Sequence, residues 1–370
     1  MTAKLFTPVQ LGGITLPNRI VISPMCQYQA NDGCMSDWHL IHLGQLAYSG
    51  AGLMMIEATG VTREGRITHG CTGLYNEANE AAMKRVVDAC RRLREAPIGI
   101  QIGHAGRKAS VHVPWAGGKP LAAGESPWQT VAPSALPFAD GWHTPHELTT
   151  SEIHQLVEAF VAAALRAKRI GIDLVELHSA HGYLLHEFQS PLSNRRADAY
   201  GKDRLKFPLE VAAAVRESWP KDRALGARIT GNDFAEGGLT PDDAVTYAKA
   251  LRRIGFDYVC VSAGNIVSGL RFPTGPGYQV PFAEKVKKAT DIRVRAVGMI
   301  ADPDQAEEIV ASGKADMVAM ARAFLDNPRW VWHAAEHFGI KIEYPPSYAR
   351  SHWDLWPGTK IARPANREAA

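Results

Sequence analysis

Residues 174–183 read Leu-Val-Glu-Leu-His-Ser-Ala-His-Gly-Tyr, a largely apolar run that ends in two histidines and a tyrosine. Apolar residues that do not simply alternate with polar ones are typical of a parallel strand covered on both faces. A helical pattern precedes the run: Thr150-Ser-Glu-Ile supplies a capping signal and Gly171 supplies a stop. A helix followed directly by a buried strand is the repeating unit of an α/β fold.

Seven further runs of the same kind lie along the chain. Two more helices are expected between them, one from Thr240-Pro-Asp-Asp to near Gly255 and one from Asp302-Pro-Asp to Gly313. Eight strands that alternate with helices favour a closed (β/α)8 TIM barrel over an open sheet. The strands are expected at Arg19–Ile22, Leu53–Glu57, Ile98–Gly103, Leu174–His178, Ala224–Ile229, Tyr258–Ser262, Val294–Val297 and Met317–Met320.

Residues 1–370 are expected to form one domain, since no linker or charged block divides the chain. A TIM barrel takes about 250 residues, so this chain has a surplus. The surplus falls in two places. One is an extended loop after the third strand, Val111–His146, which is rich in Pro, Gly and Trp; the other is a C-terminal tail over residues 345–370.

The composition argues against several classes of protein. The 41 basic and 38 acidic residues nearly cancel and no Lys/Arg run is present, so nucleic acid is not the expected partner. Apolar stretches such as Leu53–Ile56 are much shorter than a membrane span, and the N-terminus lacks a secretory pattern. Five cysteines without a repeating spacing argue against a disulfide framework. A cytoplasmic protein is expected.

The two histidines carry the strongest chemical signal. His178 falls at the C-terminal end of its strand, on the catalytic face of a TIM barrel. With His181 it could clamp one carbonyl oxygen by hydrogen bonds, and Tyr183 adds a phenolic proton source. Two alternatives stay open: the rings bond loop carbonyls, or they bind a metal together with His104, as in a metal-dependent hydrolase or lyase.

Polar clusters follow other strands as well. Residues 23–28, Ser-Pro-Met-Cys-Gln-Tyr, place a thiol and a phenol after the first strand, where a structural cysteine is the competing interpretation. Gln101 suits either the edge of a heterocycle or ordinary polar lining. Arg228 requires a partner inside the barrel, such as an anionic cofactor. The turns after the last two strands predict a phosphate site at Gly298, Met299, Ala321 and Arg322.

As a set, these segments resemble the old yellow enzyme family of FMN-dependent ene-reductases, and within it the thermophilic-like branch that includes xenobiotic reductases. The similarity runs from Leu5 to Tyr348. It rests on the stretches SPMCQY, EATG, GRIT, IQIGHAGRKA, ELHSAHGYLLHEF, SPLSNRR and GPGYQV, in this order. The resemblance implies an FMN across the mouth of the barrel, NADPH or NADH as reductant, and no metal.

The resemblance also implies which residues hold the FMN. Gln101 would bind its pyrimidine edge, Arg228 would face the part of the ring that becomes negative on reduction, and Cys26 would be a thiol that tunes the redox potential. The full set of implied contacts is Ser23, Pro24, Met25, Cys26, Ala58, Gln101, Arg228, Gly298, Met299, Ala321 and Arg322.

The implied reaction is reduction of the activated C=C bond of an α,β-unsaturated carbonyl compound, with nitro compounds as a further class. His178 and His181 would hold the carbonyl oxygen and stabilise the enolate as it develops. Tyr183 would protonate the α-carbon, and Tyr28 would be a secondary substrate contact.

The tail has two interpretations. It can pack on its own barrel, or it can reach the active site of a neighbouring subunit, as an arginine or tryptophan near this position does in the branch that the sequence resembles. Arg350 and Trp353 are the candidates for such a contact. We therefore expect a homodimer or a dimer of dimers, with the small-molecule alkene as the other partner.

Overall fold

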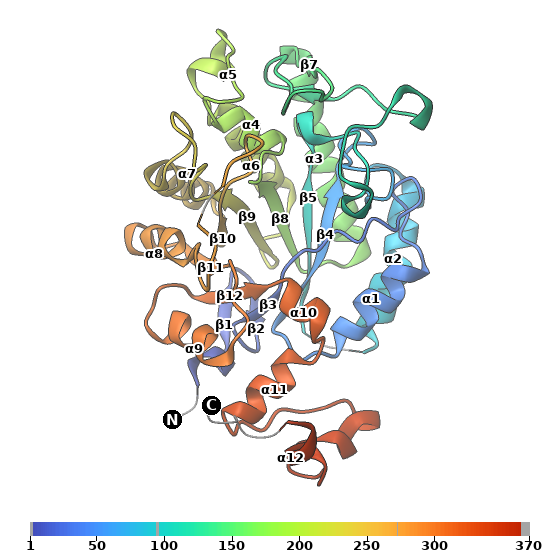
Figure 1. Ribbon diagram of the computed structural model, residues 1–370, viewed down its shortest axis with the longest axis vertical. Coiled ribbons are helices and arrows are strands. Elements are labelled where there is room, and N and C mark those ends of the chain that lie inside the picture. The colour runs from blue at the N-terminus through green and yellow to red at the C-terminus, as the bar shows by residue number, and fades with distance from the viewer. Residues whose placement is uncertain (1–2, 94–95, 272, 364–370) are drawn as a thin grey trace.

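The computed structural model describes residues 3–93, 96–271 and 273–363. Eight parallel strands close into a barrel in chain order, because the last strand pairs with the first (Figure 1). The strands are β3 (Ile20–Ile22), β4 (Leu53–Gly60), β5 (Ile98–Gly103), β8 (Leu174–Ser179), β9 (Ala224–Thr230), β10 (Tyr258–Ser262), β11 (Arg293–Ala296) and β12 (Met317–Met320). The (β/α)8 barrel predicted from the sequence is confirmed.

All eight predicted strands are present, and their bounds differ from the prediction by three residues at most. The largest difference is in β4, which continues beyond Glu57 to Gly60. Its pairing with β5 shifts register between Ile56 and Ala58. Such an irregularity bends a strand locally and redirects side chains at the rim of a barrel. The expected cofactor contact Ala58 lies at this bend.

Helices surround the barrel (Figure 1). The helix before β8 begins one residue earlier than its predicted signal, because the capping box is formed by Thr149 and Glu152. The helix after β9 has the predicted limits at Thr240 and Gly255. The main helices are α1 (Asp37–Ala47), α2 (Glu77–Arg91), α3 (Thr150–Ile170), α6 (Lys206–Ser218), α7 (Pro241–Ile254), α8 (Val280–Ala289), α9 (Pro303–Ala311) and α10 (Arg322–Asp326).

A β-hairpin that the sequence analysis did not predict closes the N-terminal end of the barrel. It consists of β1 (Val9–Leu11) and β2 (Ile14–Leu16), joined by Gly12 and Gly13. Two short apolar runs separated by Gly-Gly are a hairpin signal, and Gly12 has the positive φ of 51° that such a turn requires. The hairpin packs its buried side chains against those of the barrel interior.

A polar network lies inside this barrel core. Glu176 accepts hydrogen bonds from Gln101 Nε2 at 2.8 Å and from the Tyr258 hydroxyl at 2.7 Å, and it forms an ion pair with Arg295. All four side chains are at most 2% exposed. Arg295 Nε and Nη1 have no hydrogen-bond partner among the described residues, so the guanidinium depends on Glu176 for compensation of its charge at low dielectric.

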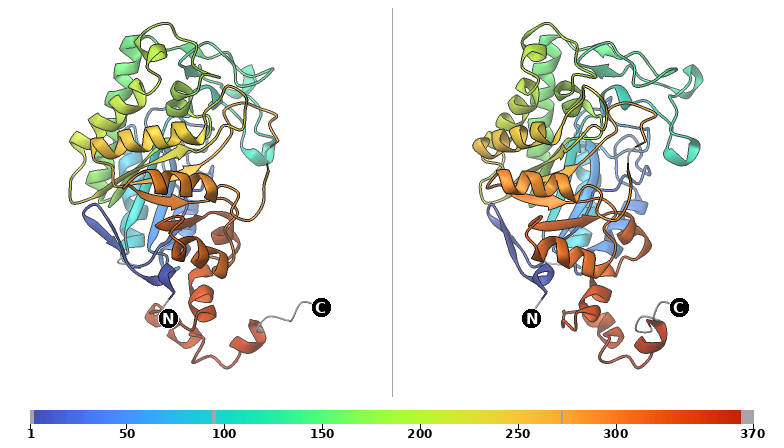
Figure 2. Two further views of the ribbon diagram at one scale, coloured as in Figure 1. Left: turned by 90° about the vertical axis from the view of Figure 1, so that its left-hand side faces the viewer. Right: turned by 60° about the vertical axis from the view of Figure 1, so that its left-hand side comes forward.

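The predicted loop and tail occupy two other regions of the molecule. The loop Val111–His146 contains the short strands β6 (Val131–Ala132) and β7 (His146–Glu147), and it lies away from the hairpin (Figure 2). The tail follows α11 (Trp330–His337) and contains α12 (Thr359–Ala362); it extends at the foot of the view in Figure 1. Across the described residues, no helix is long and apolar enough to cross a membrane.

Candidate functional site

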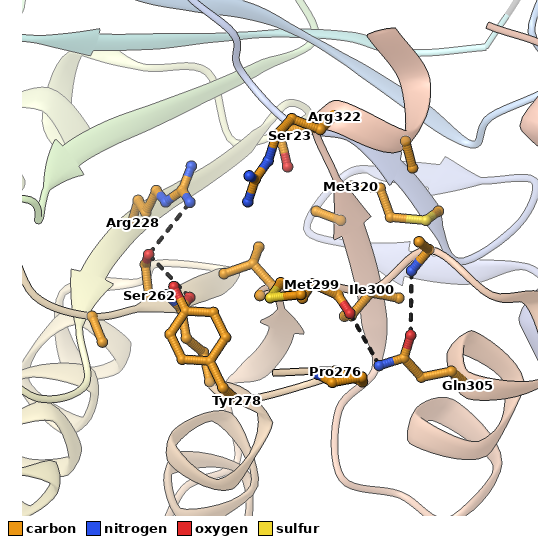
Figure 3. A pocket seen from close by; sticks show the side chains of 18 of the residues that line it. Ser23, Arg228, Ser262, Pro276, Tyr278, Met299, Ile300, Gln305, Met320 and Arg322 are labelled. Atoms are coloured by element: carbon orange, nitrogen blue, oxygen red, sulfur yellow. Dashed lines mark hydrogen bonds between the residues drawn. The ribbon is translucent and has the colours of Figure 1, made fainter. Parts of the chain in front are cut away.

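A cavity of about 770 Å³ opens at the carboxyl ends of the strands, mainly β9 to β12 and β3. This is the size of a typical cofactor or small-molecule site. Figure 3 shows Arg228 and Arg322 with their side chains turned toward this space from different elements. Its wall brings together seven residues singled out in the sequence: Ser23, His181, Arg228, Gly298, Met299, Ala321 and Arg322.

The three expected catalytic side chains lie together beside this cavity. The ring centroids of His178 and His181 are 5.0 Å apart, and those of His178 and Tyr183 are 4.9 Å apart. His178 and Tyr183 also line a small second cavity of about 20 Å³, together with Ala58 and His104. The turn after β8 therefore presents both imidazoles and the phenol at the rim of the barrel.

The imidazoles belong to a directional chain of hydrogen bonds. His178 Nδ1 accepts from the backbone N–H of Ala180 at 3.4 Å, so its proton is on Nε2, which donates to His181 Nδ1 at 3.3 Å. His181 Nε2 then donates to Ser262 Oγ at 2.7 Å, and Ser262 donates to Gln279 Oε1 at 3.2 Å. Each imidazole is thus a neutral donor through its Nε2.

The electrostatics of the site agree with this assignment. Burial lowers the pKa of both His178 and His181 well below the ordinary value, and the positive charge of Arg228 lowers it further. Burial also raises the pKa of the Tyr183 phenol. At neutral pH the site therefore holds two neutral imidazoles and a protonated phenol, all able to donate hydrogen bonds.

Arg228 supplies a positive charge next to the histidine pair, because β9 places it beside His178 on β8. Its Nη2 donates to Ser262 Oγ at 3.4 Å, whereas its buried Nε has no hydrogen-bond partner among the residues described. A guanidinium group with an unused buried donor beside a cavity fits an acceptor-rich or anionic ligand.

The turns after β11 and β12 form a cradle at the far end of the cavity. Gly298 has a φ of 110°, and a Cβ there would meet the Gln279 side chain at 3.0 Å. Met299 also has a positive φ, 51°. Ala321 has a negative φ, −108°, so this turn does not require a glycine for a left-handed backbone. Arg322 brings a cation to the same cavity, so the cradle suits a phosphate.

Only part of the segment after β3 reaches the cavity. Ser23 lines it, whereas Pro24, Met25, Cys26 and Tyr28 line neither cavity. Burial and the nearby carboxyl of Glu57 raise the pKa of the Cys26 thiol, whose neighbours include the hydroxyl of Tyr28. Cys26 is therefore a neutral thiol at ordinary pH, and not an activated nucleophile.

Gln101 also lies away from the cavity wall. It is 2% exposed, and its Nε2 is committed to the Glu176 carboxylate inside the barrel. Its carbonyl oxygen is not used by this bond and stays available as an acceptor. The contact with the FMN pyrimidine edge, which the resemblance implied for Gln101, remains a prediction, and the interior partner Glu176 was not anticipated.

The tail residues lie outside this site. Trp353 lines a separate cavity of about 280 Å³ formed by the tail and Glu336, and Arg350 lines none of the cavities described here. Within one subunit, the structure does not bring Arg350 or Trp353 to the histidine pair.

Metal ligation was the competing interpretation of the histidines. Among the residues that the structure describes, no group of three or more His, Cys, Asp or Glu side chains is arranged to hold a metal ion. His104 Nδ1 accepts from the backbone N–H of Gly106 at 3.0 Å, and burial lowers its pKa to about 4.

Comparison with known proteins assigns this arrangement to a family. A family model described as the NADH:flavin oxidoreductase / NADH oxidase family matches residues 4–340. The chain belongs to this family. It is the old yellow enzyme family that the sequence motifs indicated, so that prediction is confirmed, and the protein is an FMN-dependent NAD(P)H oxidoreductase.

Individual relatives agree with this membership. The chain is 43% identical over 355 residues to an NADPH dehydrogenase of Geobacillus thermodenitrificans, covering 95% of this chain and 99% of the relative. It is 40% identical to an NADPH dehydrogenase of Listeria innocua, covering 94% and 99%. The solved structure of morphinone reductase superposes with a TM-score of 0.74 at 31% identity, covering 94% of this chain and 93% of that one.

The old yellow enzyme site contains residues that sequence reasoning missed. Ser262 contacts both His181 and Arg228, and it is the last residue of a predicted strand, which was the available signal. Gln279 follows in the quoted stretch GPGYQV and accepts from Ser262. Lys108 and His186 lie within two other quoted stretches, and both contact the turn that carries His181.

Proposed function

We propose that the protein is an ene-reductase that reduces the activated C=C bond of α,β-unsaturated carbonyl compounds, with nitro compounds as a further class of acceptor. One observation carries the proposal: two neutral imidazoles in hydrogen-bond contact and a protonated phenol stand beside a large cavity that is also lined by the half-buried cation Arg228. This set suits a reaction in which negative charge develops on oxygen while carbon receives a proton.

FMN is proposed to occupy the large cavity. Bound FMN would supply the redox chemistry, which is hydride transfer from NADPH or NADH to the β-carbon of the acceptor. Arg228 would stabilise the negative charge on the reduced ring, and Arg322 with the turn at Gly298 would hold the phosphate. The other proposed contacts are Ser23, Pro24, Met25, Cys26, Ala58, Gln101, Met299 and Ala321.

The chain's own residues would carry out the remaining steps. His178 and His181 would turn their N–H donors to the carbonyl oxygen of the acceptor and stabilise the enolate. Tyr183 would donate its phenolic proton to the α-carbon, and Tyr28 would contact the substrate. Because both rings are neutral, they would act as hydrogen-bond donors and not as acids.

The test replaces both His178 and His181 by Ala and measures the oxidation of NADPH and of NADH by cyclohex-2-enone under anaerobic conditions. Loss of one such donor typically lowers the rate by about 10²–10³-fold, and donors acting on one oxygen are not additive. We expect kcat/KM to fall at least that far while the FMN content stays unchanged. His337→Ala, on α11, is the matched control and should leave the rate unaltered.

Several results would contradict the proposal. Wild-type protein that bleaches with NADPH but reduces no enone or nitroalkene would exclude ene reduction. Undiminished turnover in the double variant would exclude the histidine pair as the oxyanion site. A colourless protein whose hydrolase or lyase activity depends on zinc would support the metal-dependent alternative.

We also propose that the tail serves a neighbouring subunit in a homodimer or dimer of dimers. The position of Arg350 and Trp353 outside their own site supports this, since they would then be free to line another. A variant truncated after residue 344 should show a raised KM for the enone and a smaller mass by light scattering. An unchanged KM and an unchanged mass would contradict the proposal.

All five cysteines are free thiols, which supports a cytoplasmic location.

A further inference from the structure

A half-buried lysine and a buried histidine contact one peptide bond in the turn that carries His181. The carbonyl oxygen of His181 accepts a hydrogen bond from Lys108 Nζ at 2.8 Å. The N–H of the same peptide unit, from Gly182, donates to His186 Nδ1 at 2.8 Å. Lys108 ends the turn after β5, whereas His186 lies on α4 (Leu184–Gln189), so the peptide is held from two elements.

We infer that Lys108 and His186 are positioning residues that clamp the His181–Gly182 peptide and thereby hold the His181 imidazole in place. The inference rests on the proposed function, in which His181 binds the acceptor's oxygen. Neither Lys108 nor His186 lines the two cavities of the site, so neither is placed to touch the acceptor itself.

The clamp is needed because the turn has an unfavourable backbone. His181 has a φ of 61°, in the left-handed region that costs a non-glycine residue about 1–2 kcal/mol. Gly182 follows with a φ of 72°, and a Cβ there would lie 2.2 Å from the carbonyl oxygen of Asn265. A turn of this kind persists only where its surroundings fix it.

Lys108 is suited to its part because both of its hydrogen bonds go to backbone oxygens. Besides His181 it donates to the carbonyl oxygen of Asn265 at 3.1 Å, so it ties the turn after β8 to the loop after β10. The ammonium group lies 4.7 Å from the ring centroid of Phe138 and 5.2 Å from that of Tyr183. These contacts hold the cation over two aromatic faces.

His186 is suited to its part because a carboxylate lies against the ring nitrogen that does not face the peptide. Its Nε2 lies 2.9 Å from Asp233 Oδ1, and both side chains are fully buried. Asp233 is held in turn by Ser190 Oγ at 2.9 Å and by the N–H of Leu239 at 2.8 Å. With the proton on Nε2, facing the carboxylate, Nδ1 remains an acceptor for the peptide N–H.

The clamp also determines where the His181 imidazole lies. With the peptide fixed, His181 Nε2 meets Ser262 Oγ at 2.7 Å and Nδ1 meets His178 at 3.3 Å. Relaxation of φ toward negative values would swing the ring out of this line. The proposed function turns this Nε2–H from Ser262 to the acceptor's oxygen, so the clamp fixes the backbone from which the ring turns and keeps the donor within reach.

The test is Lys108→Met, which keeps an unbranched apolar stem and removes the donor. Two readouts are compared in the FMN-loaded protein: kcat/KM for cyclohex-2-enone, and the ¹⁵N-bound proton signal of His181 Nε2 in NMR spectra, assigned by its loss in His181→Gln. We expect kcat/KM to fall at least 10-fold and the His181 signal to shift. Reoxidation of the reduced enzyme by O₂, which needs no bound carbonyl, should change less than 2-fold.

Matched variants separate positioning from folding. Lys119→Met makes the same change at an exposed lysine of the long loop and should alter neither readout. Lys108→Arg retains donors and should recover at least part of the loss. His186→Asn keeps an acceptor near the position of Nδ1, so it should retain more enone turnover than His186→Leu.

Each outcome bears on the inference. An unchanged His181 signal together with unchanged kcat/KM in Lys108→Met would overturn the clamp. Equal losses of FMN retention, O₂ reoxidation and enone turnover would also overturn it, because they would show a general structural role. If wild-type protein reduces no enone but the His181 signal still moves in Lys108→Met, the clamp stands and the proposed function fails.

Discussion

Replacement of Glu176 by Gln provides a sharp test of the polar network inside the barrel. The change keeps the shape of the side chain and removes its charge. Arg295, which is 1% exposed, would then lose its counter-charge, and Tyr258 would lose a charged acceptor. Burial opposes the charge on Arg295, and Glu176 raises its pKa despite that burial.

The expected magnitude follows from this burial. Removing one partner of a buried ion pair typically costs about 3–5 kcal/mol, since it leaves an uncompensated charge at low dielectric. The exposed ion pair of Lys84 and Asp88 serves as the comparison. Its side chains are about half exposed, and such a pair four residues apart on a helix adds at most about 0.5 kcal/mol to the free energy of unfolding. We therefore expect Glu176→Gln to lower the free energy of unfolding by about 3 kcal/mol or more, and Asp88→Asn to change it very little.

The assay is urea unfolding of the FMN-loaded protein and of the FMN-free protein. Because Glu176 also holds the amide of Gln101, the variant should in addition bind FMN more weakly. The double variant Glu176→Leu with Arg295→Met removes both charges, so its stability should return close to that of the wild type.

Two results would refute this reasoning. If Glu176→Gln is as stable as wild type, the guanidinium is not a buried charge that needs its partner. If the double variant is no more stable than Glu176→Gln, the penalty comes from packing or from the lost hydrogen bonds to Gln101 and Tyr258, and not from an unpaired cation.

Three further predictions concern the proton donor, the phosphate cradle and acid stability. Tyr183→Phe should slow enone reduction by about 10²–10⁴-fold, measured by stopped flow, with FMN reduction by NADPH unaffected. Arg322→Met should weaken FMN binding by roughly 10- to 100-fold in fluorescence titrations yet leave riboflavin binding unchanged, because riboflavin lacks the phosphate. Burial lowers the pKa of His42 and of His104 to about 4, so each imidazole stays neutral in the fold but binds a proton when unfolded below about pH 6.5. Above pH 6.5 these imidazoles do not lower the free energy of unfolding. As the pH falls from 6.5 toward 4, proton uptake by the unfolded chain lowers that free energy by roughly 3 kcal/mol per residue. His42→Leu should flatten this dependence in urea titrations; an unaltered slope would exclude His42 as a source of it.

The barrel was predictable because each strand has a local signal in the sequence. The apolar run ending at His178 and the glycine stop at Gly171 report burial and helix termination within a few residues. The same local logic extends to the hairpin, whose Gly12–Gly13 turn was overlooked although it is a recognised signal.

Relations between distant strands were out of reach. Gln101 faces Glu176 because β5 and β8 pair in that register, and no property of either segment alone fixes the pairing. Ser262 lies beside Arg228 for a similar reason, through the pairing of β9 with β10. Contacts of this kind depend on closure of the whole barrel. The sequence therefore indicated the chemistry of the site but not which of its side chains bond to one another.

The hairpin at the base of the barrel also limits the route by which small molecules reach the cavity. With that end sealed by packed side chains, the described part of the chain leaves the rim as the route to the cavity. The reductant and the oxidant would then enter through the same opening and bind one after the other. An excess of either compound should obstruct the other, so velocity should pass through a maximum as the enone concentration rises.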